Sequence, residues 1–118
     1  MADSILRVKA KDFAKNIIFL CRMLKHKGVE GSLINQLLRS GTSIGANVHE
    51  AQYAQGTKDF ISKFEIALKE CNESEYWLEL LFEVNNISKT EFEDFQKKCI
   101  ELRRMLVSSV TTLKEKMP

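Results

Sequence analysis

The chain has 118 residues, the length of one domain, and its 44% hydrophobic and 29% charged residues exclude a disordered chain. Its longest apolar stretches are only a few residues, so we expect a cytoplasmic protein with neither a membrane span nor a secretory signal peptide. The net charge of +2 is too small to indicate nucleic-acid binding by itself.

Four stretches in which apolar residues recur every three or four positions predict four amphipathic helices. The first is expected over about residues 4–26, ending before Gly28. The second is expected over about residues 32–54, with Ser32 as its N-cap. Residues 40–45 within it have poor helix propensity, which leaves a loop as the alternative. The unbroken apolar spacing on both sides favours a continuous helix.

The third helix is expected over about residues 57–85, capped by Thr57, and the fourth over about residues 88–116. Ser88 followed by Glu91 is typical of a capping box. Because short connections force neighbouring helices to pair, the sequence predicts one all-α domain, an antiparallel up-and-down four-helix bundle. The predicted core positions are Leu6, Ala10, Phe13, Ile17, Leu20, Leu24, Leu37, Gly41, Ile44, Val48, Ala51, Phe60, Phe64, Ala67, Cys71, Ser74, Leu78, either Leu81 or Phe82, and Phe92, Phe95, Cys99, Leu102, Leu106, Ser109 and Leu113.

The sequence carries no motif that indicates catalysis or a cofactor. Three cysteines without a CxxC pair predict reduced core thiols rather than disulfides or a zinc site. His49-Glu50 begins like a zinc-protease motif, but Tyr53 stands where the second histidine ligand belongs. We therefore expect no enzyme, no metal, no cofactor and no small-molecule substrate.

The third helix carries more apolar residues than one core-facing stripe needs. Trp77, Leu80 and Val84 fall outside its predicted core positions, as Ile5, Val8, Phe19 and Met23 do on the first helix. Either these helices wrap deeply into the bundle, or the residues form a subunit interface. Tryptophan is enriched at interfaces, which favours the second interpretation and a homo-oligomer.

Five basic residues of the first helix fall within about 80° of arc. Such a stripe fits a phosphate backbone, but its residues alone favour an ordinary solvated face. Residues 1–30 hold seven Lys/Arg against three Asp/Glu, whereas residues 58–85 hold three against seven. The residues of this basic stripe are Arg7, Lys11, Lys15, Arg22 and Lys25.

A polar ridge follows one side of the second helix, where Gln36, Ser40, Ser43, Asn47 and Glu50 recur every three or four residues beside Arg39. The ridge is either a solvent face or a hydrogen-bonded contact with another helix or subunit. Exposed positions gain nothing from Gly, Ser and Thr, so the composition favours the contact.

The run Leu37-Leu38-Arg39-Ser40-Gly41-Thr42-Ser43-Ile44-Gly45-Ala46-Asn47-Val48-His49-Glu50-Ala51 resembles the four-helix-bundle proteins encoded within intervening sequences of bacterial 23S ribosomal RNA genes. Asp59-Phe60, residues 66–70 and Glu75-Tyr76-Trp77-Leu78 extend the resemblance over essentially the whole chain. It implies a cytoplasmic bacterial protein that assembles as a homopentamer. It also implies kinship with the basic, nucleic-acid-binding accessory bundle protein of diversity-generating retroelements. Arg39, Ser43, Asn47 and Glu50 are motif positions of the family without an assigned role.

Three hypotheses about function follow. The first is a homo-oligomeric module that binds RNA or DNA weakly through backbone phosphates. The second is a structural or protein-interaction adaptor without a nucleic-acid role, and the third is an enzyme that no motif reveals. Retention on RNA or DNA across a salt series separates the first two.

Overall fold

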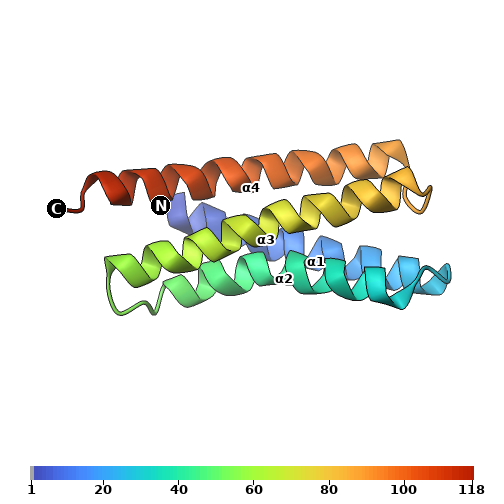
Figure 1. The fold of residues 1–118 in the computed structure, drawn as a ribbon, viewed down its shortest axis with the longest axis horizontal. Coiled ribbons are helices and arrows are strands. Elements are labelled where there is room, and N and C mark those ends of the chain that lie inside the picture. Colours follow the sequence, from blue (N-terminus) through green and yellow to red (C-terminus); the bar gives the residue numbers. More distant parts are fainter. Residues whose placement is uncertain (1) are drawn as a thin grey trace.

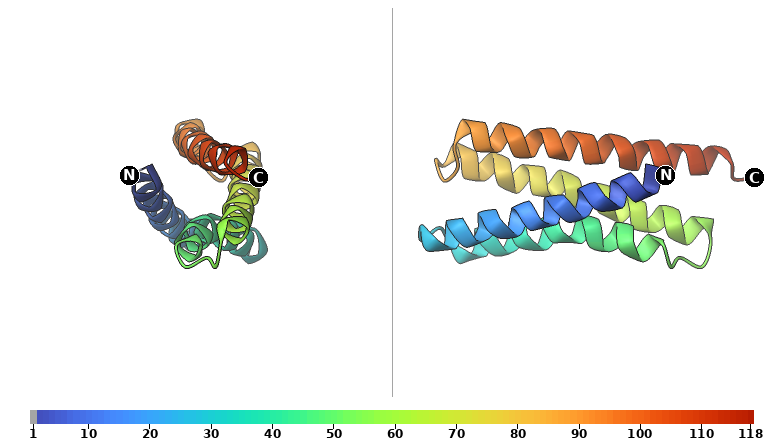
Figure 2. Two further views of the ribbon diagram at one scale, coloured as in Figure 1. Left: turned by 90° about the vertical axis from the view of Figure 1, so that its left-hand side faces the viewer. Right: turned by 180° about the vertical axis from the view of Figure 1, so that it is seen from behind.

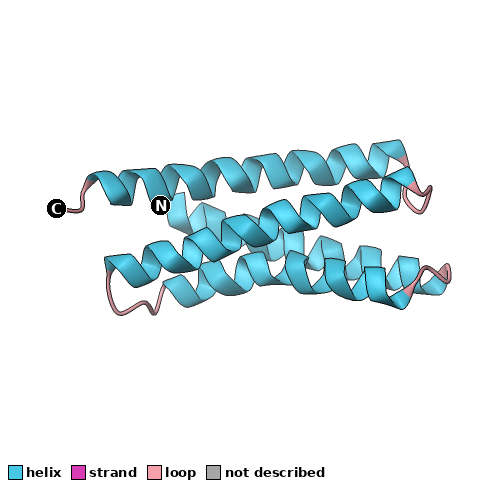
Figure 3. Ribbon diagram, in the orientation of Figure 1, coloured by secondary structure: helices cyan, strands magenta, loops and turns pink. Residues whose placement is uncertain are grey.

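The computed structural model of the chain describes residues 2–118, and their side chains from residue 4 onwards. It contains four helices, α1 (Ala2–His26), α2 (Gly31–Ala51), α3 (Thr57–Glu83) and α4 (Lys89–Glu115). The described residues form no strand, so the predicted all-α class is confirmed (Figure 3). None of these helices combines the length and the apolar character that a bilayer span requires.

The four helices form an elongated bundle of 51 × 22 × 20 Å in which each helix runs opposite to the one before it (Figure 1). Helices that follow one another in the chain pack side by side, as short connections require. The fourth side is more open, because α1 and α4 touch much less than the other neighbours do (Figure 2). The Phe13 and Phe95 rings meet edge-on there, with centroids 6.1 Å apart, and Lys9 Nζ lies 3.2 Å from Glu101 Oε2.

The core follows the heptad spacing of the sequence closely, because each helix turns one apolar stripe inward. All six positions predicted for α1 and all five predicted for α2 are buried. Three positions at the ends of the stripes are wrong: Phe60, Ser109 and Leu113 are half-buried. Ile61 and Val110, next to the first two, are buried instead. A straight helix drifts from a strict seven-residue repeat, which shifts the inward position by one residue near helix ends.

Residues 40–45 are helical, so the predicted continuous helix is confirmed and the loop alternative is wrong. Two glycines explain why poor helix formers stand there. A Cβ on Gly41 would lie 2.8 Å from both Cγ atoms of Ile17, and one on Gly45 would lie 3.3 Å from the carbonyl oxygen of Ala10. A Cβ at Gly41 would overlap the Ile17 side chain, and one at Gly45 would be tight against the α1 backbone, so the two glycines let α1 and α2 pack closely here.

The start of α2 differs from the prediction, because its N-cap is Glu30 and not Ser32. Gly28 adopts a left-handed φ of 81° that reverses the chain after α1. The Val29 amide then donates to the Leu24 carbonyl at 3.1 Å, which brings the chain into line for α2 before Ser32 is reached. At its other end α2 stops at Ala51, three residues before the predicted boundary.

The start of α3 also differs, since Gly56 is the N-cap and Thr57 is the first helical residue. The carboxylate of Asp59 accepts a hydrogen bond from the Gln55 amide at 3.2 Å, so an acidic side chain of the first turn orders this junction. At the start of α4 the predicted capping box is confirmed. Ser88 Oγ accepts from the Glu91 amide at 3.1 Å, and Glu91 Oε1 accepts from the Ser88 amide at 2.8 Å.

Candidate nucleic-acid interface

The basic stripe lies along the outer surface of α1, and all five of its residues are exposed. Arg7 donates to Ser4 Oγ at 3.5 Å, and the guanidinium of Arg22 lies 5.9 Å from the ring centroid of Phe19. Among the side chains that the structure describes, no acidic group forms an ion pair with any of the five. The stripe therefore keeps its positive charge available to an external anion.

A groove between α1 and α2 borders the N-terminal half of the basic stripe. Its volume is about 870 Å³. Arg7 and Lys11 stand on the α1 side, and His49 and Glu50 stand on the α2 side. Gly45 and Ala46 also line the groove from α2. The groove offers cations on one rim only.

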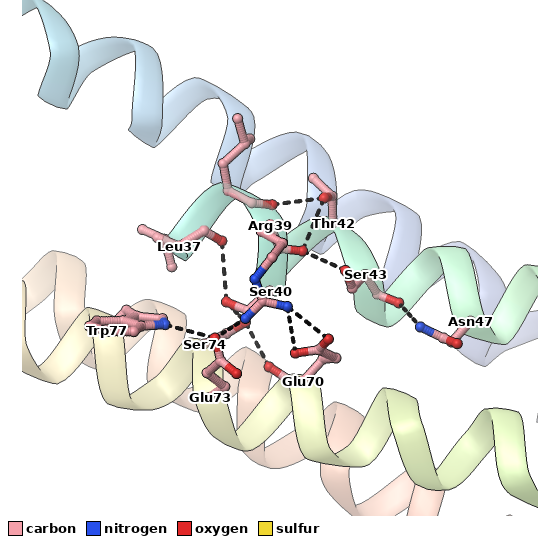
Figure 4. Close-up of polar contacts among 11 residues, drawn as sticks. Leu37, Arg39, Ser40, Thr42, Ser43, Asn47, Glu70, Glu73, Ser74 and Trp77 are labelled. Carbon is pink, nitrogen blue, oxygen red and sulfur yellow. Dashed lines mark hydrogen bonds and ion pairs between the residues drawn. The ribbon is translucent and has the colours of Figure 1, made fainter. Parts of the chain in front are cut away.

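The polar ridge of α2 divides into residues that reach α3 and residues that do not. Ser40 is fully buried and accepts a hydrogen bond from Ser74 Oγ of α3 at 2.9 Å, while it donates to the Leu37 carbonyl at 3.3 Å. Figure 4 shows this pair between the two helices, with Arg39 beside it. Glu50 lies 3.8 Å from Lys63 Nζ of α3.

Arg39 joins α2 to two carboxylates of α3. Its guanidinium donates to Glu70 Oε2 at 3.0 Å and also to Glu73. Glu73 in turn accepts from the indole Nε1 of Trp77 at 3.1 Å. These bonds favour the charged forms: the indole, followed by Arg39, lowers the pKa of Glu73, and the hydrogen bond to Glu73 raises the pKa of Arg39.

The other ridge residues bond to their own helix. Ser43 Oγ donates to the Arg39 carbonyl at 2.6 Å, and Asn47 Nδ2 donates to the Ser43 carbonyl at 2.8 Å. Gln36 is exposed. The ridge is therefore not one continuous surface. It consists of a contact with α3 around residues 39 and 40, and a series of side-chain bonds back to the helix around residues 43 and 47.

The residues proposed from sequence as a subunit interface lie on the outward side of α3. Trp77 and Leu80 are half-buried, whereas 53% of Val84 is exposed. Trp77 is fixed in place by its bond to Glu73 and by the ring of Tyr76, whose centroid lies 5.1 Å away. The surface is thus partly apolar and has an ordered aromatic residue near its middle.

Sequence reasoning missed the acidic and polar partners on α3. Glu70, Glu73 and Ser74 complete the contact with α2, and Arg103 of α4 donates to Glu75 at 2.8 Å on the opposite side of α3. Ser74 carries the one available signal, because a serine at a predicted core position needs a buried hydrogen-bonding partner. Nothing in the sequence distinguishes Glu70 and Glu73 from the other surface glutamates.

The three cysteines of the chain lie in the core, away from these surfaces. Cys21, Cys71 and Cys99 are free and buried, as the sequence predicts, and burial raises the pKa of Cys21 to about 11. His26 and His49 are both exposed. In the part of the chain that the structure describes, no three potential metal ligands come together.

Two comparisons with known proteins identify relatives of this chain. The family model of the 23S rRNA-intervening sequence protein matches residues 2–108. The chain is also similar to a crystal structure of a protein of unknown function from the S23 ribosomal protein family of Bacteroides thetaiotaomicron VPI-5482, with 42% sequence identity and a TM-score of 0.91. That match covers 94% of this chain and 99% of the other. None of the curated proteins compared with the chain matches it.

The resemblance drawn from residues 37–51 is confirmed by the family model, and the bundle is the fold of a solved relative. The chain therefore belongs to the 23S rRNA-intervening sequence protein family.

Proposed function

We propose that this protein is a non-enzymatic homo-oligomer that binds RNA or DNA weakly, through backbone phosphates, along the basic stripe of α1. The observation that carries the proposal is that five cations lie along one exposed side of α1. Among the described side chains, no carboxylate forms an ion pair with any of the five, although Lys9 of the same helix pairs with Glu101 of α4.

Phosphate contacts explain why such a stripe is useful without a specific pocket. Each Lys or Arg that neutralises a phosphate releases condensed counterions, and this release supplies sequence-independent affinity. The stripe extends from Arg7 to Lys25, a rise of about 27 Å along the helix. That length is enough to contact several successive phosphates of one strand.

Oligomerisation strengthens the proposal, because one protomer has a net charge of only +2. An assembly repeats the basic stripe in every copy, so several weak contacts engage one nucleic acid together. The resemblance to the family implies five copies. The exposed apolar residues of α1 and α3 support self-association, since a surface of that size is unusual on a monomer.

The hydrogen bonds of the polar residues on α2 favour a binding role over a catalytic one. The polar residues of α2 around Arg39 and Ser40 are engaged by α3 or by their own backbone, so they hold the helices in register. The structural relative in the S23 ribosomal protein family has unknown function, and it suggests no reaction.

The decisive experiment measures binding of the purified protein to a labelled single-stranded RNA, and to the DNA of the same sequence, across a salt series. We expect weak binding to both that falls steeply as salt rises. A complete lack of retention at low salt contradicts the nucleic-acid role. In that case the exposed apolar faces favour the alternative, an adaptor that contacts other proteins.

A further inference from the structure

Two helices of the bundle expose apolar side chains along their outer surfaces. On α1, 61% of Phe19 and 60% of Val8 are exposed. On α3, 55% of Tyr76 and 53% of Val84 are exposed. We define the α1 apolar face as Ile5, Val8, Phe19 and Met23, and the α3 apolar face as Ile66, Tyr76, Leu80 and Val84.

The two apolar faces match in length. The α1 face begins at Ile5 and ends at Met23, and the α3 face begins at Ile66 and ends at Val84. Both pairs are the same number of residues apart, so the ends of each face lie about 27 Å apart along its helix, with polar side chains between Val8 and Phe19 and between Ile66 and Tyr76. Side by side in the same direction, the faces bring Phe19 next to Leu80.

The two faces lie on opposite corners of the protomer, so they cannot cover each other within one chain. Helices α1 and α3 each pack on α2 and α4 but not on one another. The end-on view in Figure 2 places them diagonally across the bundle. A contact between these faces must therefore join two copies and use different surfaces on each.

The opposite net charges of α1 and α3 also favour a contact between α1 of one copy and α3 of another. Residues 1–30, which include α1, have an excess of four basic residues, and residues 58–85, which form α3, have an excess of four acidic ones. A contact of α1 with α1, or of α3 with α3, would place like charges together, which costs free energy. Lys15 and Arg22 border the α1 face, and Glu79 and Glu83 border the α3 face, all exposed.

We propose that the α1 apolar face of one copy packs along the α3 apolar face of a second copy. The inference rests on the proposed homo-oligomer and specifies its contact. Because the contact is head-to-tail, each copy keeps one free face of each kind until a ring closes. Rotation about an axis along the bundle preserves helix direction, so α1 and the neighbouring α3 run parallel. The contact covers the apolar side of α1. Of the basic stripe, Lys15 and Arg22 border the contact, whereas Arg7, Lys11 and Lys25 stay outside it and open to phosphates.

The test uses two variants whose substitutions fall only on residues that are more than half exposed. Val8→Glu with Phe19→Glu changes the α1 face, and Tyr76→Lys with Val84→Lys changes the α3 face. Each places a charge opposite residues of the same sign. The control, Tyr53→Lys with Val107→Lys, changes exposed apolar residues outside both faces. Light scattering gives the mass of each, and circular dichroism checks that each remains folded.

We expect both face variants to be folded monomers and the control to keep the wild-type mass. Mixing the two face variants restores the contact between the two unchanged faces, and the substituted faces then carry opposite charges, so the mixture forms at least a heterodimer with one copy of each. If one face variant alone dissociates, the contact uses the same surface on both copies, and the pairing is wrong. The pairing is also wrong if both keep the wild-type mass, or if mixing gives no heterodimer. A monomeric wild type contradicts the proposed assembly itself.

Discussion

The hydroxyl oxygens of Ser40 on α2 and Ser74 on α3 lie 2.9 Å apart, and both residues are fully buried. A polar group in a core is tolerated only when it is hydrogen-bonded. The two hydroxyls share one hydrogen bond, and each also lies within hydrogen-bonding distance of a carbonyl of its own helix, Leu37 at 3.3 Å and Glu70 at 2.9 Å. The pair therefore fixes the axial register of α2 against α3.

We expect this pair to contribute about 1 kcal/mol to the free energy of unfolding, the usual net value of a buried hydrogen bond. The measurement is a double-mutant cycle of Ser40→Ala, Ser74→Ala and the double variant, unfolded by urea at one protomer concentration. The cycle cancels the better helix propensity of alanine, which single variants mix into the result. Additive single effects would show that the two hydroxyls do not interact.

The close approach of α1 and α2 depends on Gly41, and Gly41→Ala is expected to be destabilising. Alanine gains about 1 kcal/mol of helix propensity over glycine. Its Cβ would lie 2.8 Å from two carbons of Ile17, however, and that stiff β-branched side chain cannot swing away. Overpacking of this kind costs about 1–3 kcal/mol, so we expect a net loss of stability in thermal or urea unfolding.

Gly31→Ala is the matched control, because no atom lies within 4 Å of the Cβ it would add at the start of α2. It should be neutral or stabilising. A second check is Ile17→Val in the Gly41→Ala background, which should lose less stability than the same change in the wild type. If Gly41→Ala is as stable as Gly31→Ala, the two helices are not in tight contact there.

The positions of the helices could be predicted from the sequence, because the spacing of apolar residues decides which face of a helix is buried. Their first residues could not all be predicted. Ser32 and Thr57 are good N-cap residues, but Gly28 turns the chain early and Gly56 takes the extended position before α3. The path of the chain between helices thus overrides local capping preference at these two starts. At Ser88 the prediction is correct.

The sequence predicted only part of the contact between α2 and α3. The unusual composition around Gly41 indicates close packing, but it does not say which helix approaches. The glycine faces Ile17 of α1, whereas its neighbour Ser40 faces Ser74 of α3. The partners of Arg39 could not be found, because surface glutamates occur throughout the chain and only the helix register selects Glu70 and Glu73.

Glu73 should titrate below the ordinary range of a glutamate. Bonds from Trp77 and Arg39 favour its carboxylate and lower its pKa in the folded state. The stabilisation is therefore present above the unfolded-state pKa of about 4.3 and is lost as pH falls through the folded-state value. Trp77 is the single tryptophan, so its fluorescence reports this titration directly.

The control is Glu73→Gln, which should lack the fluorescence step in the acidic range. It should also be less stable than the wild type at neutral pH, with a difference that narrows as the pH is lowered. A fluorescence midpoint at or above the ordinary glutamate value would contradict the assignment. So would a step that persists in Glu73→Gln.

Arg7→Glu with Lys11→Glu should remove most nucleic-acid binding if the basic stripe contacts phosphates. The two residues stand one turn apart on the exposed side of α1, away from the proposed subunit contact. Each lost phosphate contact should lower the slope of log affinity against log salt by about one. Fluorescence anisotropy with a labelled single strand, measured over a salt series, gives this slope.

Lys97→Glu with Arg104→Glu on α4 makes the same change of net charge with the same residue types, also at exposed positions. This control should bind nearly as well as the wild type, because it leaves the stripe intact. Equal losses in the two variants would mean that net charge alone attracts the nucleic acid and that α1 has no special part. Both variants should keep the helicity and mass of the wild type, since neither changes an apolar face. A loss of binding in the α1 variant alone, with a reduced salt slope, therefore locates the phosphate contacts on the stripe.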